Sequence, residues 1–263
     1  MTDIILCGAS GRMGKAVAAY AGENDCRVVA GVDLNASEAE FPIVKSINDV
    51  EVRADVVIDF SHHTAVEQLI PYAKKTHIPL VIATTGHNEE ELNGINKLSK
   101  SVPVFYSRNM SLGVNLLINI CKNAAAALGS SFDIEIIEKH HNRKLDAPSG
   151  TALMIAEAIK EVRSGAEYVY DRTRDMQPRQ KNEIGIQAVR GGNIIGEHEV
   201  LFCGNSEVLS VSHSASSREL FAEGALRAAA YIKSKQKGLY SMKELLLEVS
   251  GGTNANTERP LSV

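Results

Sequence analysis

Short apolar runs alternate with amphipathic segments through the first 110 residues of the chain. Runs typical of strands lie at residues 4–7, 27–33, 54–61, 79–86 and 102–107. Apolar residues at helical spacing follow them, for example Val66, Leu69 and Ala73 after the third run. The runs are apolar on both faces, which is typical of parallel strands covered by helices on both sides. The pattern predicts a doubly wound α/β domain over residues 1–110.

The pattern changes after Asn109. Helices are predicted at 114–128 and 149–162, and alternating strands at 131–138, 184–190, 193–202 and 207–215. Because short glycine turns join the last three strands, we expect antiparallel hairpins there, and a long loop over 164–181. This half, residues 111–218, is predicted to be a mixed-sheet α+β domain with helices on one face. A last helix from 219 returns the chain to the first domain, which residues 219–250 complete, and 251–263 form a loose tail.

Charge and cysteine usage narrow the class of protein. The 263 residues carry a net charge of −4, which gives a nucleic-acid partner no electrostatic support. We expect no apolar run to be long enough to span a bilayer, and the N-terminus does not resemble a signal peptide. The four cysteines lack CxxC spacing and indicate reduced, buried thiols: Cys7, Cys26, Cys121 and Cys203. We expect a cytoplasmic protein that binds neither membranes nor nucleic acids.

A glycine loop joins the first predicted strand to the first helix. Gly8, Gly11 and Gly14 form a GxxGxxG variant of the dinucleotide fingerprint, and Asp33 ends the second strand, where a carboxylate can accept the ribose hydroxyls. A plain tight turn is the alternative. With this context we predict a Rossmann-type nucleotide domain whose cofactor contacts include residues of the loop and of the ends of the fourth and fifth strands: Gly8, Ala9, Ser10, Gly11, Arg12, Met13, Gly14, Asp33, Ala83, Thr84, Thr85, Ser107, Arg108, Asn109 and Met110.

A basic stretch, "EKHHNRKLDAPSGTA", runs from Glu138 to Ala152. Pro148 and Ser149 mark the start of a helix, so the amides of Gly150 and Thr151 would lie at its positive end. A cluster of cations beside a helix N-terminus suits an anion, and several cations suit two carboxylates. The cations in question are His140, His141, Arg143 and Lys144.

Other interpretations of these residues remain open. The basic stretch could be a solvated loop. A metal site is disfavoured, because adjacent histidines of an extended chain point in opposite directions and no further ligand stands at the required spacing. A second pair, His62 and His63, lies near the expected cofactor cleft without a predicted role, and His198 and His213 fit structural positions in strands.

The basic stretch closely resembles the signature of the dihydrodipicolinate reductases, E-x-H-H-x-x-K-x-D-A-P-S-G-T-A, at every fixed position. Further segments resemble the family in its own order from about residue 3 to about residue 245, among them "GASGRMG", "VVIDFS", "ATTG", "NMSLGVN" and "IGIQAVRGGNIIGEHEVLF". The resemblance implies NADH- or NADPH-dependent reduction of 4-hydroxy-tetrahydrodipicolinate to tetrahydrodipicolinate in lysine and diaminopimelate synthesis. It also implies a homotetramer.

Residue roles follow from the same resemblance. His140 corresponds to the acid–base residue, Lys144 to the proton donor and His141 to a substrate contact, while Gly150 and Thr151 correspond to the amides that grip one carboxylate. The family often has glycine where Ala83 stands and phenylalanine near Met110. Leu34 and Asn35 follow Asp33 where NADPH-using relatives often carry arginine, which predicts a preference for NADH with NADPH still usable.

Two other functions are alternatives to the interpretation as a reductase. One is another two-lobed dehydrogenase acting on an acid derived from an amino acid. The other is a non-catalytic sensor that binds a dinucleotide. Against the sensor stands the pairing of His140 with Lys144, which binding alone does not require.

Overall fold

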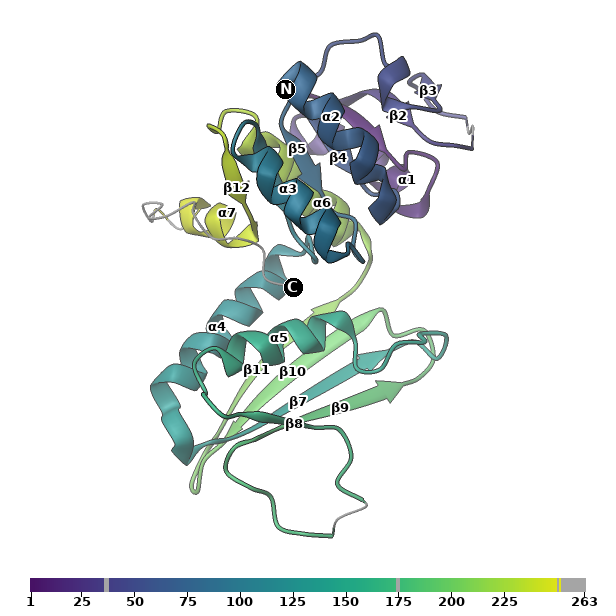
Figure 1. Cartoon of the computed structure of the whole chain (residues 1–263). Coiled ribbons are helices and arrows are strands. Elements are labelled where there is room, and N and C mark those ends of the chain that lie inside the picture. The colour runs from purple at the N-terminus through teal and green to yellow at the C-terminus, as the bar shows by residue number, and fades with distance from the viewer. Residues whose placement is uncertain (36–37, 174–175, 250, 252–263) are drawn as a thin grey trace. The chain divides into compact units, whose positions relative to one another are not determined.

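The computed structural model describes residues 1–35, 38–173, 176–249 and 251. The chain divides into two compact units, one formed by Met1–Leu112 together with the chain from Glu219 onward, the other by Gly113–Arg218. Each unit contains one sheet with helices packed on it (Figure 1). The predicted tail, 251–263, lies outside the described residues apart from Gly251.

The first unit is built on a parallel sheet of seven strands in the order β12-β6-β5-β4-β1-β2-β3. The prediction of a doubly wound Rossmann-type sheet is confirmed. Two short edge strands were not predicted, because two or three residues give no periodic signal. The strands are β1 (Thr2–Cys7), β2 (Cys26–Val32), β3 (Ile43–Val44), β4 (Val56–Asp59), β5 (Leu80–Ile82), β6 (Pro103–Tyr106) and β12 (Gly238–Tyr240).

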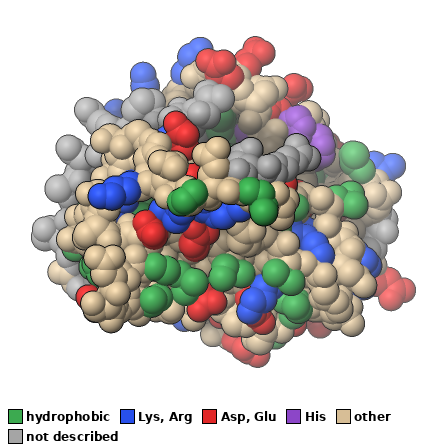
Figure 2. Space-filling view, turned by 90° about the horizontal axis from the view of Figure 1, so that it is seen from below, with side chains coloured by type: hydrophobic (Ala, Val, Ile, Leu, Met, Phe, Trp, Pro, Cys, Tyr) green, Lys and Arg blue, Asp and Glu red, His purple; other side chains and the backbone are tan. Residues whose placement is uncertain are grey.

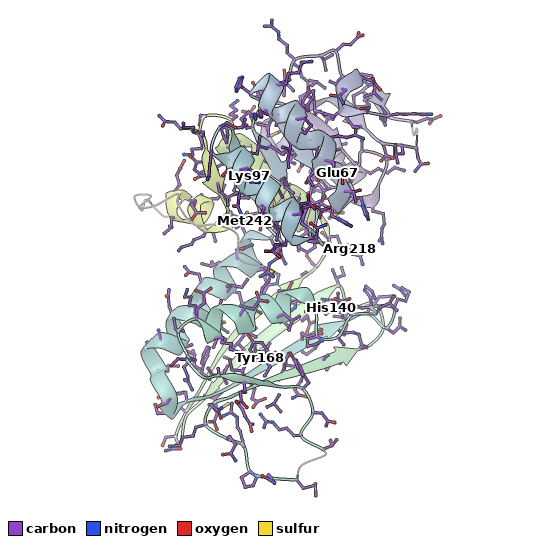
Figure 3. The ribbon with its side chains drawn as sticks, in the orientation of Figure 1. Glu67, Lys97, His140, Tyr168, Arg218 and Met242 are labelled. Atoms are coloured by element: carbon purple, nitrogen blue, oxygen red, sulfur yellow. The ribbon has the colours of Figure 1, made fainter. Side chains whose placement is uncertain are left out.

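Helices cover both faces of this sheet, which is why its strands are apolar on both sides. One face packs against α1 (Arg12–Tyr20), α6 (Glu219–Ile232) and α7 (Met242–Val249, with Met242 labelled in Figure 3). The other packs against α2 (Val66–Thr76) and α3 (Glu89–Ser99). Short 3₁₀ turns link them: η1 (Gly22–Asn24), η2 (Ile47–Asp49) and η3 (His63–Ala65).

The second unit holds a mixed sheet in the order β11-β10-β7-β9-β8. The predicted hairpin between β10 and β11 is present, but the expected hairpin between β9 and β10 is wrong. Strand β7 lies between them, parallel to β9 and antiparallel to β10, so the 191–195 turn crosses the end of β7. The strands are β7 (Asp133–His140), β8 (Glu167–Val169), β9 (Glu183–Arg190), β10 (Gly196–Cys203) and β11 (Val208–Ala215). Strand β8 falls inside the stretch predicted to be a loop.

One face of this sheet is covered by α4 (Leu112–Leu128), which η4 (Gly129–Ser131) follows, and by α5 (Gly150–Lys160). Alternate residues of β7 point toward these helices, first Ile134 and Ile136, then Glu138 and His140. The opposite face keeps exposed apolar side chains, including Val189 and Val208. Figure 2 shows a face of the molecule on which hydrophobic side chains lie among charged ones.

The expectation that no apolar run could span a bilayer needs correction. The segment Leu112–Ser131 is long and apolar enough by length and composition alone, with a mean hydropathy of 1.3. Its inner stripe of Leu117, Cys121 and Ala125 is nevertheless part of the core of the second unit. Lys122 on the same helix forms an ion pair with Glu161. These contacts are those of a helix packed on a sheet.

Candidate active site

The glycine loop after β1 leaves no room for a side chain at Gly8 or Gly14. Gly8 adopts a φ of +76°, and a Cβ on Gly14 would lie 2.2 Å from the carbonyl oxygen of Gly8. Helix α1 follows with Gly11 as its N-cap, which supplies no capping side chain. The first-turn amides of α1 therefore have no side-chain acceptor at the cap, and such a glycine-lined helix start fits a pyrophosphate.

Asp33 stands directly after β2 and is tied to this loop. Its Oδ2 accepts a hydrogen bond from the Ser10 amide at 3.0 Å, and its Oδ1 accepts one from the Asn35 amide at 2.9 Å. The Ser10 hydroxyl donates to the Asn35 carbonyl at 2.6 Å. The carboxylate is thus fixed beside the glycine loop, while the neighbouring Leu34 side chain is 79% exposed.

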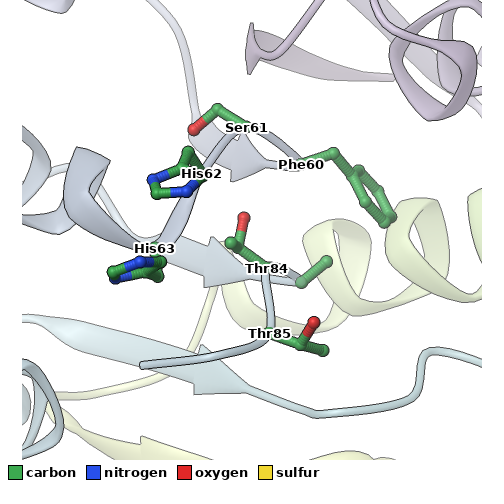
Figure 4. Close-up of a pocket in the computed structure, with 7 residues that line it drawn as sticks. Phe60, Ser61, His62, His63, Thr84 and Thr85 are labelled. Carbon is green, nitrogen blue, oxygen red and sulfur yellow. The ribbon is translucent and has the colours of Figure 1, made fainter. Parts of the chain in front are cut away.

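A cavity of about 280 Å³ opens in the first unit beyond the ends of β4 and β5 (Figure 4). Of the predicted contacts, Ala83, Thr84 and Thr85 line it. They are joined by residues from the turn after β4, namely Phe60, Ser61, His62 and His63. Ligands of parallel α/β sheets bind at this edge, outside the carboxyl ends of the strands.

Asp59, which ends β4, organises this cavity and was not predicted. It is fully buried, and its Oδ1 accepts hydrogen bonds from the amide and hydroxyl of Ser61 at 3.0 and 2.5 Å. The Thr84 hydroxyl donates to its Oδ2 at 2.8 Å. Burial raises the pKa of Asp59, although these bonds oppose the shift. The sequence feature that could have identified Asp59 was an acidic residue at the end of an apolar run.

The histidine pair beside the cavity has structural contacts. His63 Nδ1 lies 2.7 Å from Glu91 Oε1, and Glu91 also closes the capping box of α3 with Asn88. The ring of His62 lies 4.2 Å from that of His63 between centroids. His63 therefore joins the turn after β4 to the start of α3.

The segment after β6 is held by its own short bonds. The Ser107 hydroxyl donates to the Asn109 carbonyl at 2.7 Å, and Asn109 Oδ1 accepts from the Ser111 amide at 2.9 Å. Met110 is buried in the core, whereas Arg108 is exposed. A Cβ on Gly224 of α6 would lie 1.7 Å from the Met110 carbonyl oxygen, so α6 packs directly on this segment.

In the second unit, His140 ends β7 (labelled in Figure 3). Its Nδ1 lies 2.6 Å from Oε2 of Glu138, a carboxylate with no exposed surface. Arg190, at the end of β9, donates to both oxygens of Glu138 at 2.8 and 2.7 Å. The amide of Ser149 donates to Oε1 at 2.9 Å. A buried carboxylate thus links β7, β9 and the start of α5.

Charge and burial act in opposite directions on Glu138. Burial alone would raise its pKa, but Arg190, His140 and the Ser149 amide outweigh it and lower the pKa. Glu138 and Arg190 were not among the predicted site residues. Glu138 opens the family signature, yet only the pairing of β7 with β9 brings Arg190 beside it.

Helix α5 begins at Gly150, with Ser149 as the predicted N-cap, whose Oγ accepts a hydrogen bond from the Ala152 amide at 3.2 Å. Gly150 and Thr151 form its first turn. His198 Nε2 lies 3.0 Å from the same Ser149 Oγ. Desolvation, followed by the charge of His140, lowers the pKa of His198 to about 4, so it is neutral near pH 7.

The remaining cations of the basic stretch occupy the loop between β7 and α5. Lys144 Nζ lies 2.9 Å from Asp146 Oδ1, and Arg143 donates to Asn193 at 3.1 Å. His141 Nε2 lies 3.3 Å from a guanidinium nitrogen of Arg218. Desolvation, then the nearby positive charges led by Arg143, lowers the pKa of His141. An anion bound here would relieve that charge repulsion.

The second unit therefore gathers His140, His141, Lys144 and the start of α5 at one end of its sheet. Among the residues that the structure describes, no group of three His, Cys, Asp or Glu side chains could hold a metal ion.

Two family models match consecutive parts of the chain. Residues 2–110 match "Dihydrodipicolinate reductase, N-terminus", and residues 113–246 match "Dihydrodipicolinate reductase, C-terminus". The chain belongs to the dihydrodipicolinate reductase family. The predicted resemblance is confirmed, and with it the prediction of an oxidoreductase.

Individual relatives agree with the family match. A 4-hydroxy-tetrahydrodipicolinate reductase of Caldanaerobacter subterraneus is 53% identical over 94% of this chain and 98% of its own length. The enzyme of that name from Clostridium novyi is 47% identical with the same coverage. A dipicolinate-bound dihydrodipicolinate reductase from Paenisporosarcina sp. TG-14 has a TM-score of 0.78 at 25% identity, covering 92% of this chain and 97% of that one. The family match indicates a nicotinamide nucleotide cofactor.

Proposed function

We propose that the protein reduces 4-hydroxy-tetrahydrodipicolinate to tetrahydrodipicolinate, a step of lysine and diaminopimelate biosynthesis. The substrate loses water, and a hydride together with a proton then reduces its ring. The bound nicotinamide nucleotide would supply that hydride. The observation that carries the proposal is the buried Glu138–His140 bond beside the first turn of α5, in a chain that two reductase family models cover.

On the substrate side, we assign the predicted roles to the second unit. His140 exchanges a proton with the substrate and Lys144 donates one. His141 contacts the substrate, and the amides of Gly150 and Thr151 bind a carboxylate at the N-terminus of α5. Charge-assisted bonds to carboxylates are the stronger hydrogen bonds in proteins, and this loop offers several cations for a dicarboxylate. Lys144 would exchange its contact with Asp146 for the substrate.

On the cofactor side, we assign binding to the first unit. The pyrophosphate would lie against the glycine loop, from Gly8 through Gly14, and the adenosine ribose against Asp33. The cavity beside Thr84 and Thr85 and the segment from Ser107 through Met110 would take the nicotinamide side. Support comes from the tight glycine loop, where a Cβ on Gly8 or Gly14 would collide with backbone atoms, and from the neighbouring strand ends.

NADH is proposed as the preferred cofactor, with NADPH still usable. A 2′-phosphate would meet the fixed carboxylate of Asp33, and like charges repel. Leu34 and Asn35 offer no cation in compensation, whereas the exposed Arg12 at the start of α1 offers one. Values of kcat/KM measured for both cofactors at fixed ionic strength test this order, and a ratio that favours NADPH contradicts it.

A homotetramer in the cytoplasm completes the proposal. The outer face of the second sheet carries exposed apolar residues, including Val189 and Val208, that no helix in the described part of the chain covers. Such a face suits contact with further copies of the chain. The cysteines are free thiols, consistent with a reducing compartment, although Cys203 is half-buried and not buried as predicted. Sedimentation equilibrium tests the tetramer, and a monomer at all concentrations contradicts it.

The decisive experiment for the reaction is cofactor oxidation followed at the nicotinamide absorbance band. The substrate is made in situ from pyruvate and aspartate semialdehyde by the upstream synthase. We expect oxidation that depends on both the synthase and this protein. A protein that binds NADH but never oxidises it would instead be the dinucleotide sensor considered above.

A further inference from the structure

We propose that the Glu138–Arg190 ion pair is a positioning device that serves both proton-transfer residues. Glu138 orients the ring of His140, and Arg190 holds the loop that carries Lys144. The inference rests on the proposed function, which assigns His140 and Lys144 to catalysis. It adds two residues that act on the reaction through others.

The first step is that Glu138 is a fully satisfied buried carboxylate. Its Oε1 accepts from Arg190 at 2.7 Å and from the Ser149 amide at 2.9 Å. Its Oε2 accepts from Arg190 at 2.8 Å and bonds His140 Nδ1 at 2.6 Å. A buried charge is stable only when it is paired and hydrogen-bonded, and this one has four contacts. Glu138 therefore remains ionised and fixed in position.

The second step concerns the ring of His140. An ionised carboxylate can only accept hydrogen bonds, so we assign the ring hydrogen to Nδ1. In the neutral ring, Nε2 is then the nitrogen with a free lone pair. A Cβ on Gly196 would lie 3.1 Å from this Nε2, so the glycine keeps space beside the reactive atom. Glu138 thereby selects both the tautomer and the orientation that proton exchange requires.

The third step links the same pair to Lys144. The guanidinium nitrogen of Arg190 that contacts Glu138 Oε1 also donates to the Asp146 carbonyl at 2.7 Å. Asp146 in turn contacts Lys144 through its side chain at 2.9 Å. Arg190 therefore ties the loop backbone, two residues after Lys144, to the strand that ends in His140. A bidentate guanidinium suits this role, since a lysine could not make all these bonds at once.

Other ionisable groups surround the pair and set its electrostatic background. From β10 the ring of His198 lies 5.3 Å from that of His140 between centroids. The charges that act on His198 and Arg190 come from β7, β11 and the loop, namely Glu138, His140, His213, Lys144 and Asp146. Of the two carboxylates among them, only Glu138 contacts the His140 ring. Neutralising Glu138 therefore perturbs the contact with the His140 ring specifically.

The test is Glu138→Gln, studied by steady-state kinetics across pH. Glutamine keeps the size of the side chain and an oxygen acceptor but removes the charge that stabilises protonated His140. We expect kcat to fall by about 10- to 10⁴-fold, the upper value being that for the carboxylate that orients the histidine of a catalytic triad. The KM for the dicarboxylate should stay within about threefold, since the lost contact is not with substrate. The pH–kcat profile should change as well, because the variant removes the charge that contacts the ring proposed to exchange the proton.

The matched control is Glu135→Gln on the opposite face of the same strand. Glu135 is also a carboxylate bonded to arginines, Arg172 at 2.8 Å and Arg179 at 3.0 Å, without contact to His140. We expect wild-type kcat and pH profile from it. Equal losses in the two variants, or a loss in Glu138→Gln with an unmoved pH profile, would overturn the positioning role. So would a Glu138→Gln enzyme with wild-type kcat.

Two further measurements keep the inference testable. If Glu138→Gln does not fold, Arg190→Lys, which retains the charge, should still lower kcat about three- to tenfold at unchanged KM. Unaltered kcat there overturns the proposal. Nitrogen-15 NMR of the histidine rings, which needs no turnover, should show His140 with its hydrogen on Nδ1. The other tautomer overturns the inference even if the enzyme is active, whereas an inactive wild type would count against the proposed function alone.

Discussion

Gly196→Ala places one methyl group against the nitrogen of His140 that is proposed to exchange the proton. The added Cβ would lie 3.1 Å from Nε2 and 3.5 Å from Cδ2, where ordinary contacts begin at 3.4 Å. To reach an ordinary contact distance, the added Cβ and Nε2 must move apart by a few tenths of an ångström. The His140 ring cannot easily move, because its Nδ1 lies 2.6 Å from Glu138, which Arg190 fixes in turn.

The size of the effect follows from this geometry. A misplacement of about 1 Å at a reacting group can cost about 100-fold in rate, so a few tenths should cost about three- to tenfold, or about 0.7–1.4 kcal/mol in the barrier. The assay is kcat/KM by cofactor oxidation, with thermal unfolding to show that the fold persists. Gly191→Ala is the control, since its Cβ would meet nothing within 4 Å. A Gly196→Ala enzyme within twofold of wild type would refute the placement of Nε2 at the reaction.

Further expectations concern both units. His140→Ala and Lys144→Ala should each lose about 10²- to 10⁴-fold in kcat while NADH titration shows unchanged binding, and near-full turnover in either would remove its role. A pyridine dicarboxylate should compete with substrate more strongly than a pyridine monocarboxylate, and equal inhibition constants would argue against a two-carboxylate site. Leu34→Arg should move the kcat/KM ratio toward NADPH, about tenfold for 1.4 kcal/mol, and an unmoved ratio would mean that the phosphate is recognised elsewhere. Gly224→Ala should lower the free energy of unfolding by at least about 1–3 kcal/mol in denaturant titrations, because its Cβ would lie 1.7 Å from the Met110 carbonyl oxygen; an unchanged midpoint would contradict that contact.

Features that depend on neighbouring residues were readable from the sequence. The glycine loop between β1 and α1 follows from a spacing of a few residues, and so do the Ser149 cap of α5 and the hairpin of β10 with β11. The alternation of apolar runs with helical segments predicted the parallel sheet for the same reason. In each case the pattern records which side chains one short element must bury.

Tertiary structure alone decided what lies between distant segments. Glu138 and Arg190 are 52 residues apart, and they meet because β7 enters the sheet between β9 and β10, which the glycine turn had suggested were neighbours. Asp59 reaches Thr84 only through the pairing of β4 with β5. Strand order depends on the burial and backbone pairing of the whole sheet, and no local spacing encodes it. The sequence therefore indicated His140 and Lys144 as candidate residues, while the fold brought together the Glu138–Arg190 pair that we propose positions them.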